Sequence, residues 1–187
     1  MAVESKPHLA ITMGDAAGIG PEVIAGAWPN AAVHANVAPL VIGHPEVLRR
    51  AIALLKLNVK VVEVTADEVS LRQWKSDART MACLPTGDDA VLTVPPGQID
   101  PHTGEAAYLC VCAATALAIV GQVDGIVTAP LSKSALHAAA HFYPGHTELL
   151  AELCEVTNFA MMLYMPPGPA VRGPAGCCRR RPAAGLR

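Results

Sequence analysis

Short apolar runs alternate along the chain with longer segments in which apolar and polar positions are mixed. Each run has the length of a strand and is bounded by glycine, proline or polar residues, whereas the mixed segments have the length of helices. The runs that predict strands are 9–13, 39–43, 59–64, 125–128 and 159–165. Helices are predicted from Pro21 onward and over 45–57, 105–122, 133–140 and 147–154.

This alternation predicts an α/β fold with a mostly parallel sheet and helices on both faces. The segment 105–122 is rich in Ala, Leu, Val and Cys, so we expect a buried helix that Gly121 or Gly125 closes. The less regular middle of the chain holds two further apolar segments, 81–84 and 91–94, which could form strands of a smaller or peripheral sheet.

Composition fits one ordinary soluble domain, or one domain and a fragment of a second, because 52% of the 187 residues are hydrophobic. The net charge of −2 predicts neither a nucleic-acid nor a membrane-surface partner. The N-terminus lacks a secretion signal and no long uninterrupted apolar stretch occurs, so we expect a cytoplasmic protein. The six cysteines lack zinc-type spacing and are predicted to be structural thiols: Cys83, Cys110, Cys112, Cys154, Cys177 and Cys178.

The end of the chain departs from the α/β pattern, because five of the nine arginines follow residue 170 among Pro, Ala and Gly. We therefore divide the chain into a folded portion, 1–170, and an irregular basic tail, 171–187. Three interpretations of the tail are a disordered segment, a phosphate-binding patch and a product of a shifted reading frame. We favour the third, because a binding patch needs a scaffold to orient its side chains.

The first candidate site is a glycine-bearing turn between the first strand and the first helix. Its glycines and acid are Gly14, Asp15, Gly18 and Gly20. Glycines let backbone amides approach an anion, and the N-terminus of the following helix adds positive potential. A tight strand-to-helix connection without any ligand uses the same residues, so spacing alone leaves a ligand loop and a structural turn equally open.

The second candidate site is the turn Gly145-His146-Thr147-Glu148 at a predicted helix start. His146 and Thr147 can both form hydrogen bonds with phosphate oxygens, although Thr147 can alternatively serve only as an N-cap. Lys133 follows a predicted strand and would supply a counter-charge there, unless it is plain solvated surface. Four carboxylates are candidate acids, bases or metal ligands, with ordinary solvated surface as the alternative: Asp15, Glu22, Glu105 and Glu148.

Five motifs in the same order resemble those of the 4-hydroxythreonine-4-phosphate dehydrogenase family of pyridoxal phosphate biosynthesis. They cover about residues 8–176, and Ala16 stands where the family usually has proline. The motifs are Thr-Met-Gly-Asp-Ala-Ala-Gly-Ile-Gly-Pro-Glu (12–22), Pro-Gly-Gln…Thr-Gly-Glu-Ala-Ala (96–107), Val-Thr-Ala-Pro-Leu-Ser-Lys (127–133), Pro-Gly-His-Thr-Glu (144–148) and Met-Met-Leu (161–163).

The resemblance implies an NAD-dependent oxidation of 4-phosphohydroxy-L-threonine followed by decarboxylation, with a divalent metal (Zn, Mg or Co) that polarises the reacting oxygens. It also implies a homodimer of two-domain subunits related to isocitrate and isopropylmalate dehydrogenases. Residues 1–170 then correspond to the substrate-binding N-terminal portion, and the second domain is incomplete. In the family the Gly-His-Thr motif binds substrate, which assigns that role to His146 and Thr147.

The family holds its metal with three histidines that come from the part of the sequence just past Gly176, where the resemblance ends. We therefore assign no metal ligand and no catalytic residue here. His137 and His141, predicted four apart on a helix, lack a third ligand. We expect the chain alone to be inactive, and two alternatives stay open: a non-catalytic phosphate-binding or dimerising fragment, and a dehydrogenase of four-carbon sugar-acid 4-phosphates such as threonate or erythronate 4-phosphate.

Overall fold

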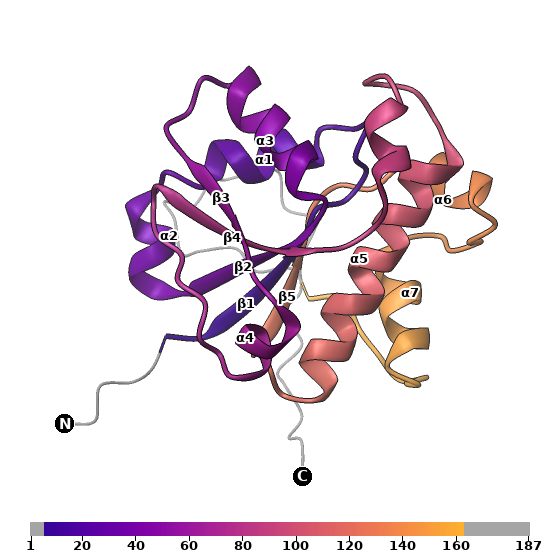
Figure 1. The fold of residues 1–187 in the computed structure, drawn as a ribbon. Coiled ribbons are helices and arrows are strands. Elements are labelled where there is room, and N and C mark those ends of the chain that lie inside the picture. Colours follow the sequence, from indigo (N-terminus) through magenta and orange to yellow (C-terminus); the bar gives the residue numbers. More distant parts are fainter. Residues whose placement is uncertain (1–5, 163–187) are drawn as a thin grey trace, which may run out of the picture.

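A single parallel sheet organises the part of the chain that the computed structural model describes, residues 6–162. Its five strands lie in the order β3-β4-β2-β1-β5, and every neighbouring pair is parallel (Figure 1). This confirms the predicted α/β class. The strands are β1 (His8–Thr12), β2 (Ala38–Gly43), β3 (Lys60–Glu63), β4 (Thr80–Pro85) and β5 (Gly125–Thr128).

Helices cover both faces of the sheet. Helices α1 and α3 pack together on one face, and α5 packs on β1, β2 and β5 from the other, with α6 and α7 outside it (Figure 1). The chain moves outward from β1 through α1 and α3 and returns to β5 through α5, and right-handed crossovers in these two directions are expected to place helices on opposite faces. The helices are α1 (Gly20–Ala27), α2 (Ala31–Asn36), α3 (Pro45–Leu54), α4 (Ala66–Ser70), α5 (Pro101–Ile119), α6 (Lys133–Ala138) and α7 (His146–Leu153).

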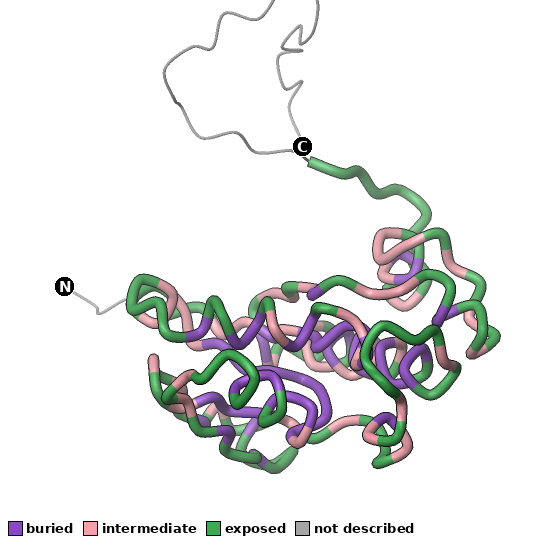
Figure 2. Tube along the Cα trace, turned by 90° about the horizontal axis from the view of Figure 1, so that it is seen from above, coloured by how far each residue is buried: buried purple, intermediate pink, exposed green. Residues whose placement is uncertain are grey.

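The hydrophobic core runs through the two central strands. Leu40, Val41 and Ile42 of β2 and Met81 and Ala82 of β4 are completely buried, as strands of a parallel sheet covered on both faces must be. In Figure 2 the buried segments lie in the middle of the molecule, and the exposed segment before the end of the described chain extends away from it.

The middle of the chain folds differently from the prediction. Strand β4 contains the apolar segment 81–84 but lies between β2 and β3 of the main sheet, so the expected smaller or peripheral sheet is wrong. The segment 91–94 is not a strand, because Asp89–Thr93 forms a 3-10 helix, η1. Asp88 is its N-cap, and the side chain of Asp88 accepts a hydrogen bond from Ala90 N at 2.8 Å. The short helices α2 and α4 were not predicted.

The long helix α5 begins earlier than expected. Asp100 is its N-cap, with its side chain accepting from His102 N at 2.8 Å, and Pro101 is its first residue. The helix ends before Gly121, which has a φ of 72° and so confirms one of the two predicted stops. By length and composition α5 is the only helix among residues 6–162 apolar enough to cross a membrane, but it packs on the sheet as a core helix.

Helices α5 and α6 touch backbone to backbone at Gly104. A Cβ atom at this position would overlap the carbonyl group of Ala135 and lie 2.9 Å from the backbone nitrogen of Leu136. Gly104 is therefore required by close helix packing, and α6 lies directly on α5 because of it.

Buried thiols behave as the sequence predicted. Burial raises the pKa of Cys83 and of Cys110 to about 12, so both thiols are protonated at neutral pH and act as small hydrophobes. Cys112 is half-buried and Cys154 is exposed, and neither forms a disulfide. Cys177 and Cys178 lie outside the described residues.

Two predictions concern the end of the chain. Residues 159–162 form no strand in the structure, and the rest of the predicted strand, 163–165, lies outside the described residues. The predicted division into 1–170 and 171–187 also falls outside them and stays a prediction.

Candidate functional site

The carboxyl ends of the parallel strands meet at one edge of the sheet, where both predicted turns lie. Strands β1 and β5 are neighbours, and Thr12 pairs in register with Thr128 at the last position of each. The glycine-bearing turn follows β1, and the segment leading to α6 follows β5. This edge is where α/β proteins bind ligands.

The glycine-bearing turn is held by its own hydrogen bonds. Asp15 N donates to Pro130 O at 3.1 Å, Gly18 N donates to Asp15 O at 3.1 Å, and Ala17 N donates to the side-chain Oδ1 of Asp15 at 3.0 Å. Gly14 has a φ of 73° and is in close contact with the Pro130 carbonyl. The structural-turn interpretation thus accounts for Gly14 and for the amides of Asp15, Ala17 and Gly18.

The Gly-His-Thr turn borders a solvent-open hollow. His146 and Thr147 from the start of α7 line it together with Ile126 and Thr128 of β5, and its volume is about 750 Å³. The remaining lining side chains are apolar or a thiol: Leu150, Ala151, Cys154, Val156, Phe159, Ala160, Met161 and Met162. The wall of the hollow therefore carries two hydroxyls and one imidazole among apolar side chains and one thiol.

His146 has an unsatisfied polar atom at this hollow. Its Nε2 atom is buried and has no hydrogen-bond partner, which is costly for an imidazole nitrogen unless a ligand or water completes the site. Burial also lowers the pKa of His146 below its usual 6.5, so the side chain is neutral at pH 7. A neutral imidazole carries one proton and can donate it in a hydrogen bond.

The start of α7 is not closed by a side chain. Gly145 is the N-cap, with no side-chain cap hydrogen bond, and Thr147 lies in the first turn. The alternative that Thr147 serves as the N-cap is therefore wrong, which leaves its hydroxyl available. The first backbone N–H groups of a helix have no intrahelical partner, so they add donors at the same place.

Lys133, the third residue predicted to bind substrate, does not line the hollow. It is the first residue of α6 and is exposed. Sequence reasoning missed Thr128, whose signal was a hydroxyl at the last position of an apolar strand. Its register partner Thr12 is completely buried, with a hydroxyl that has no partner.

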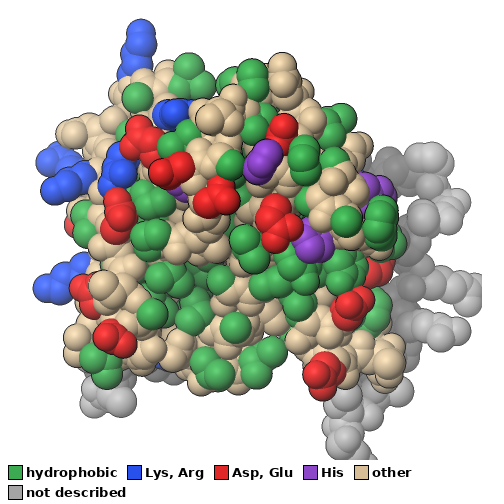
Figure 3. Space-filling view, turned by 45° about the vertical axis from the view of Figure 1, so that its right-hand side comes forward, with side chains coloured by type: hydrophobic (Ala, Val, Ile, Leu, Met, Phe, Trp, Pro, Cys, Tyr) green, Lys and Arg blue, Asp and Glu red, His purple; other side chains and the backbone are tan. Residues whose placement is uncertain are grey.

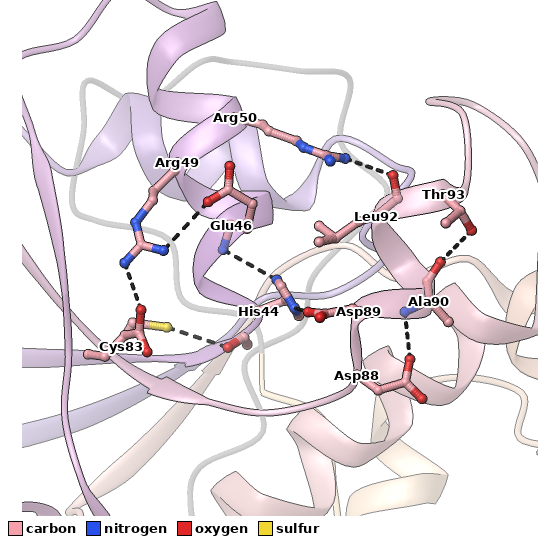
Figure 4. A network of polar contacts seen from close by, with 12 residues as sticks. His44, Glu46, Arg49, Arg50, Cys83, Asp88, Asp89, Ala90, Leu92 and Thr93 are labelled. Atoms are coloured by element: carbon pink, nitrogen blue, oxygen red, sulfur yellow. Dashed lines mark hydrogen bonds and ion pairs between the residues drawn. The ribbon is translucent and has the colours of Figure 1, made fainter.

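A second polar cluster lies at the same sheet edge but is satisfied internally (Figure 4). His44 Nδ1 accepts from Glu46 N at 3.3 Å, so its Nε2 carries the proton and donates to Asp89 Oδ1 at 3.0 Å. Arg49 pairs with Glu63 at 2.7 Å and with Glu46 at 3.5 Å, and the hydrogen bond to Glu63 raises the arginine's pKa. These groups hold α3 and η1 on the sheet.

Metal ligands do not converge in the described part of the chain. No group of three His, Cys, Asp or Glu side chains among residues 6–162 is placed to hold a metal ion. His141 lies beyond the end of α6, so it is not on a helix with His137 as predicted. Its Nε2 instead pairs with Glu105 at 2.7 Å. The donor set therefore does not fit a divalent metal.

Comparison with known proteins gives a consistent group of relatives. The family model described as "Pyridoxal phosphate biosynthetic protein PdxA" matches residues 35–168. D-threonate 4-phosphate dehydrogenase of Pectobacterium atrosepticum is 40% identical over 159 residues, 83% of this chain and 47% of the relative. 4-Hydroxythreonine-4-phosphate dehydrogenase of Trichlorobacter lovleyi is 37% identical over 160 residues, 84% of this chain and 46% of the relative.

A solved structure supports the same grouping. The crystal structure of a 4-hydroxythreonine-4-phosphate dehydrogenase from Burkholderia phymatum superposes with a TM-score of 0.79 at 39% identity. The superposition covers 87% of this chain and 48% of the Burkholderia phymatum chain. This chain spans about half the length of the curated relatives that it matches.

Proposed function

The chain belongs to the PdxA family of pyridoxal phosphate biosynthetic proteins, and we propose that it is the phosphate-binding portion of an NAD-dependent dehydrogenase. The proposed substrate is 4-phosphohydroxy-L-threonine. Its hydroxyl-bearing carbon gives a hydride to NAD⁺ and its hydroxyl gives up a proton, after which the β-keto acid loses CO₂. The relatives are named dehydrogenases, which supports this class of reaction.

The observation that carries the proposal is that His146, whose Nε2 has no hydrogen-bond partner, lines one hollow together with Thr147 and Thr128. A phosphate ester has oxygens that accept hydrogen bonds from an imidazole N–H, from hydroxyls and from the first amides of a helix. The groups at the start of α7 supply all three kinds of donor. His146 and Thr147 therefore bind and orient the phosphate in this proposal, and the described residues take no part in hydride transfer.

A second candidate substrate is D-threonate 4-phosphate, which carries a hydroxyl where 4-phosphohydroxy-L-threonine carries an amine. Among residues 6–162, no Asp or Glu lines the hollow, so these residues offer no counter-charge to an ammonium group there. Relatives named for D-threonate 4-phosphate also match this chain at 38–42% identity. Binding of both compounds should therefore be compared.

A second candidate function needs no metal site. Because residues 6–162 supply no three-ligand set, a metal-dependent step cannot be derived from them. A non-catalytic phosphate-binding fragment would need only the Gly-His-Thr turn, and a dimerising fragment is the other form of this candidate. Homodimer formation belongs to this proposal as well.

Calorimetric titration tests the phosphate site through proton uptake. The free imidazole of His146 is neutral at pH 7, because its pKa is lowered, whereas a phosphate dianion beside it favours the charged form. We therefore expect a net uptake of a fraction of a proton, up to about one per ligand, when titrations are compared in buffers of different ionisation enthalpy. Both substrates are used as ligands.

The matched control is His146→Gln, which keeps a hydrogen-bond donor but cannot titrate. It should abolish the uptake and weaken binding by about tenfold, the effect of losing one charge-assisted hydrogen bond. The proposal fails when neither ligand binds the wild-type chain, or when the variant binds both with unchanged affinity and unchanged proton uptake.

A further inference from the structure

The loop 139–145 connects α6 to α7 and so determines where His146 begins the next helix. It has no regular secondary structure apart from the turn that ends α6, where His141 N donates to Leu136 O at 2.9 Å. Ala140 has a φ of 64°, a left-handed conformation uncommon for alanine. Beyond these backbone contacts, the side chains of the loop connect it to the neighbouring helices.

Two rings of the loop lie parallel to one ring of α5. The side chain of Tyr108 stacks on His141 with ring centroids 3.6 Å apart and an interplanar angle of 14°. Tyr143 is parallel to the same ring, with centroids 6.3 Å apart and again an angle of 14°. Such pairs add stabilisation beyond that of the area they bury.

Polar contacts fix the outer ends of both loop rings. His141 Nε2 pairs with Glu105 Oε2 of α5 at 2.7 Å, and the Tyr143 hydroxyl donates to Glu152 Oε1 of α7 at 2.9 Å. Histidine and acidic side chains lie next to one another, among hydrophobic side chains, on the face shown in Figure 3. The loop is thus connected to α5 on one side and to α7 on the other.

The Tyr108 side chain, whose ring is parallel to the two loop rings, keeps a neutral hydroxyl. Hydrogen bonding to Cys112 raises the pKa of Tyr108 to about 12, so its hydroxyl is protonated over the whole neutral range. Glu105, Tyr108 and Cys112 follow one another on one face of α5, at spacings of three and four residues. One helix face therefore carries both the ring that stacks on the loop and the carboxylate that pairs with it.

We propose that Tyr108 is a positioning residue for the phosphate site. By stacking on His141 and Tyr143 it fixes the position of the loop that leads to His146 and Thr147. This inference rests on the proposed function for its ligand. Tyr108 itself is not among the residues that line the hollow. Its effect passes through the three-residue step from Tyr143 to His146.

The experiment replaces the ring while keeping an apolar side chain. Tyr108→Leu removes stacking, and Tyr108→Phe, the matched control, keeps the ring and loses only the hydroxyl. We expect Tyr108→Leu to bind 4-phosphohydroxy-L-threonine and D-threonate 4-phosphate about tenfold more weakly, and Tyr108→Phe to stay within about twofold of the wild-type chain. Both are measured by calorimetry, after far-UV circular dichroism shows the same helix content.

A double-mutant cycle separates positioning from a general structural role. In a His146→Ala background the site lacks one of the two side chains that Tyr108 is proposed to place, so Tyr108→Leu should weaken binding less than it does in the wild-type background. Equal weakening in both backgrounds, or unchanged affinity of Tyr108→Leu, overturns the inference. When the wild-type chain binds neither compound, the proposed function fails instead.

A ligand-independent measurement then decides the positioning role. Amide hydrogen exchange of residues 140–147 should become faster in Tyr108→Leu and remain unchanged in Tyr108→Phe, because only the first variant releases the loop. Equal protection of these amides in Tyr108→Leu and the wild-type chain would show that the ring does not seat the loop.

Discussion

The Gly104→Ala variant is expected to lose about 3 kcal/mol or more of its unfolding free energy, because one methyl group forces two helix backbones apart. The added Cβ would meet the carbonyl oxygen and carbon of Ala135 and the nitrogen of Leu136, none of which can rotate away as a side chain can. Helices α5 and α6 share a long contact, so the whole outer layer would shift. Urea denaturation followed by circular dichroism measures the loss.

Gly26→Ala is the matched control, since Gly26 also lies inside a helix. A Cβ there meets only the side chain of Leu55, at 3.9 Å, which is ordinary contact. The substitution should stabilise the protein by about 0.5–1 kcal/mol, the difference in helix propensity between glycine and alanine. Equal stability changes for the two variants would show that the contact at Gly104 does not constrain the packing.

The second large effect is catalytic: the purified 187-residue chain is expected to form no detectable NADH from either proposed substrate. The described residues bring no three metal ligands together, and the chain spans about half the length of its relatives. Metal polarisation of a reacting oxygen contributes several kcal/mol, and each 1.36 kcal/mol of barrier is tenfold in rate. NADH absorbance is followed with Zn²⁺, Mg²⁺ or Co²⁺ added in turn.

The control is the D-threonate 4-phosphate dehydrogenase of Salmonella typhimurium, a relative that is 41% identical over 160 residues, assayed in parallel. It should be active on D-threonate 4-phosphate in the same buffers. Turnover by the present chain that a chelator abolishes would contradict the prediction. It would mean that the chain completes a metal site through residues beyond 162 or through a second copy.

Much of the sheet could be predicted because its strands are short, mostly apolar runs bounded by glycine, proline or polar residues. Four of the predicted runs, 9–13, 39–43, 59–64 and 125–128, correspond to β1, β2, β3 and β5. What an apolar run does not specify is its neighbours. Strand β4 has the same kind of sequence, yet its place between β2 and β3 depends on crossover direction rather than on local composition.

Helix ends were harder to predict than helices, because polar first-turn residues resemble a loop. The start of α5 was placed at residue 105, although Asp100 followed by Pro101 is an N-cap and first-turn signature. The error at 91–94 has a similar cause. Its apolar residues suggested a strand, but only Val91 is buried, and the cap at Asp88 starts a short helical turn instead.

The candidate site was predicted in part. His146 and Thr147 were recognised from the Gly-His-Thr turn, and the structure places both at one hollow. The contribution of Thr128 depends on β5 lying beside α7, which no local pattern reveals. The supporting rings are equally non-local, because Tyr108 and His141 come from different elements and meet only in the folded chain.

Strand β5 pairs only with β1 among the described residues, and the bond from His8 N to Asp124 just before it spans 116 positions of sequence. Closing so large a loop is entropically expensive, so this strand should dock after β1, β2, β3 and β4 have already assembled. Thr128 belongs to β5, the strand that is expected to dock last. Proposed ligand binding at the hollow should therefore require that β5 has docked on β1.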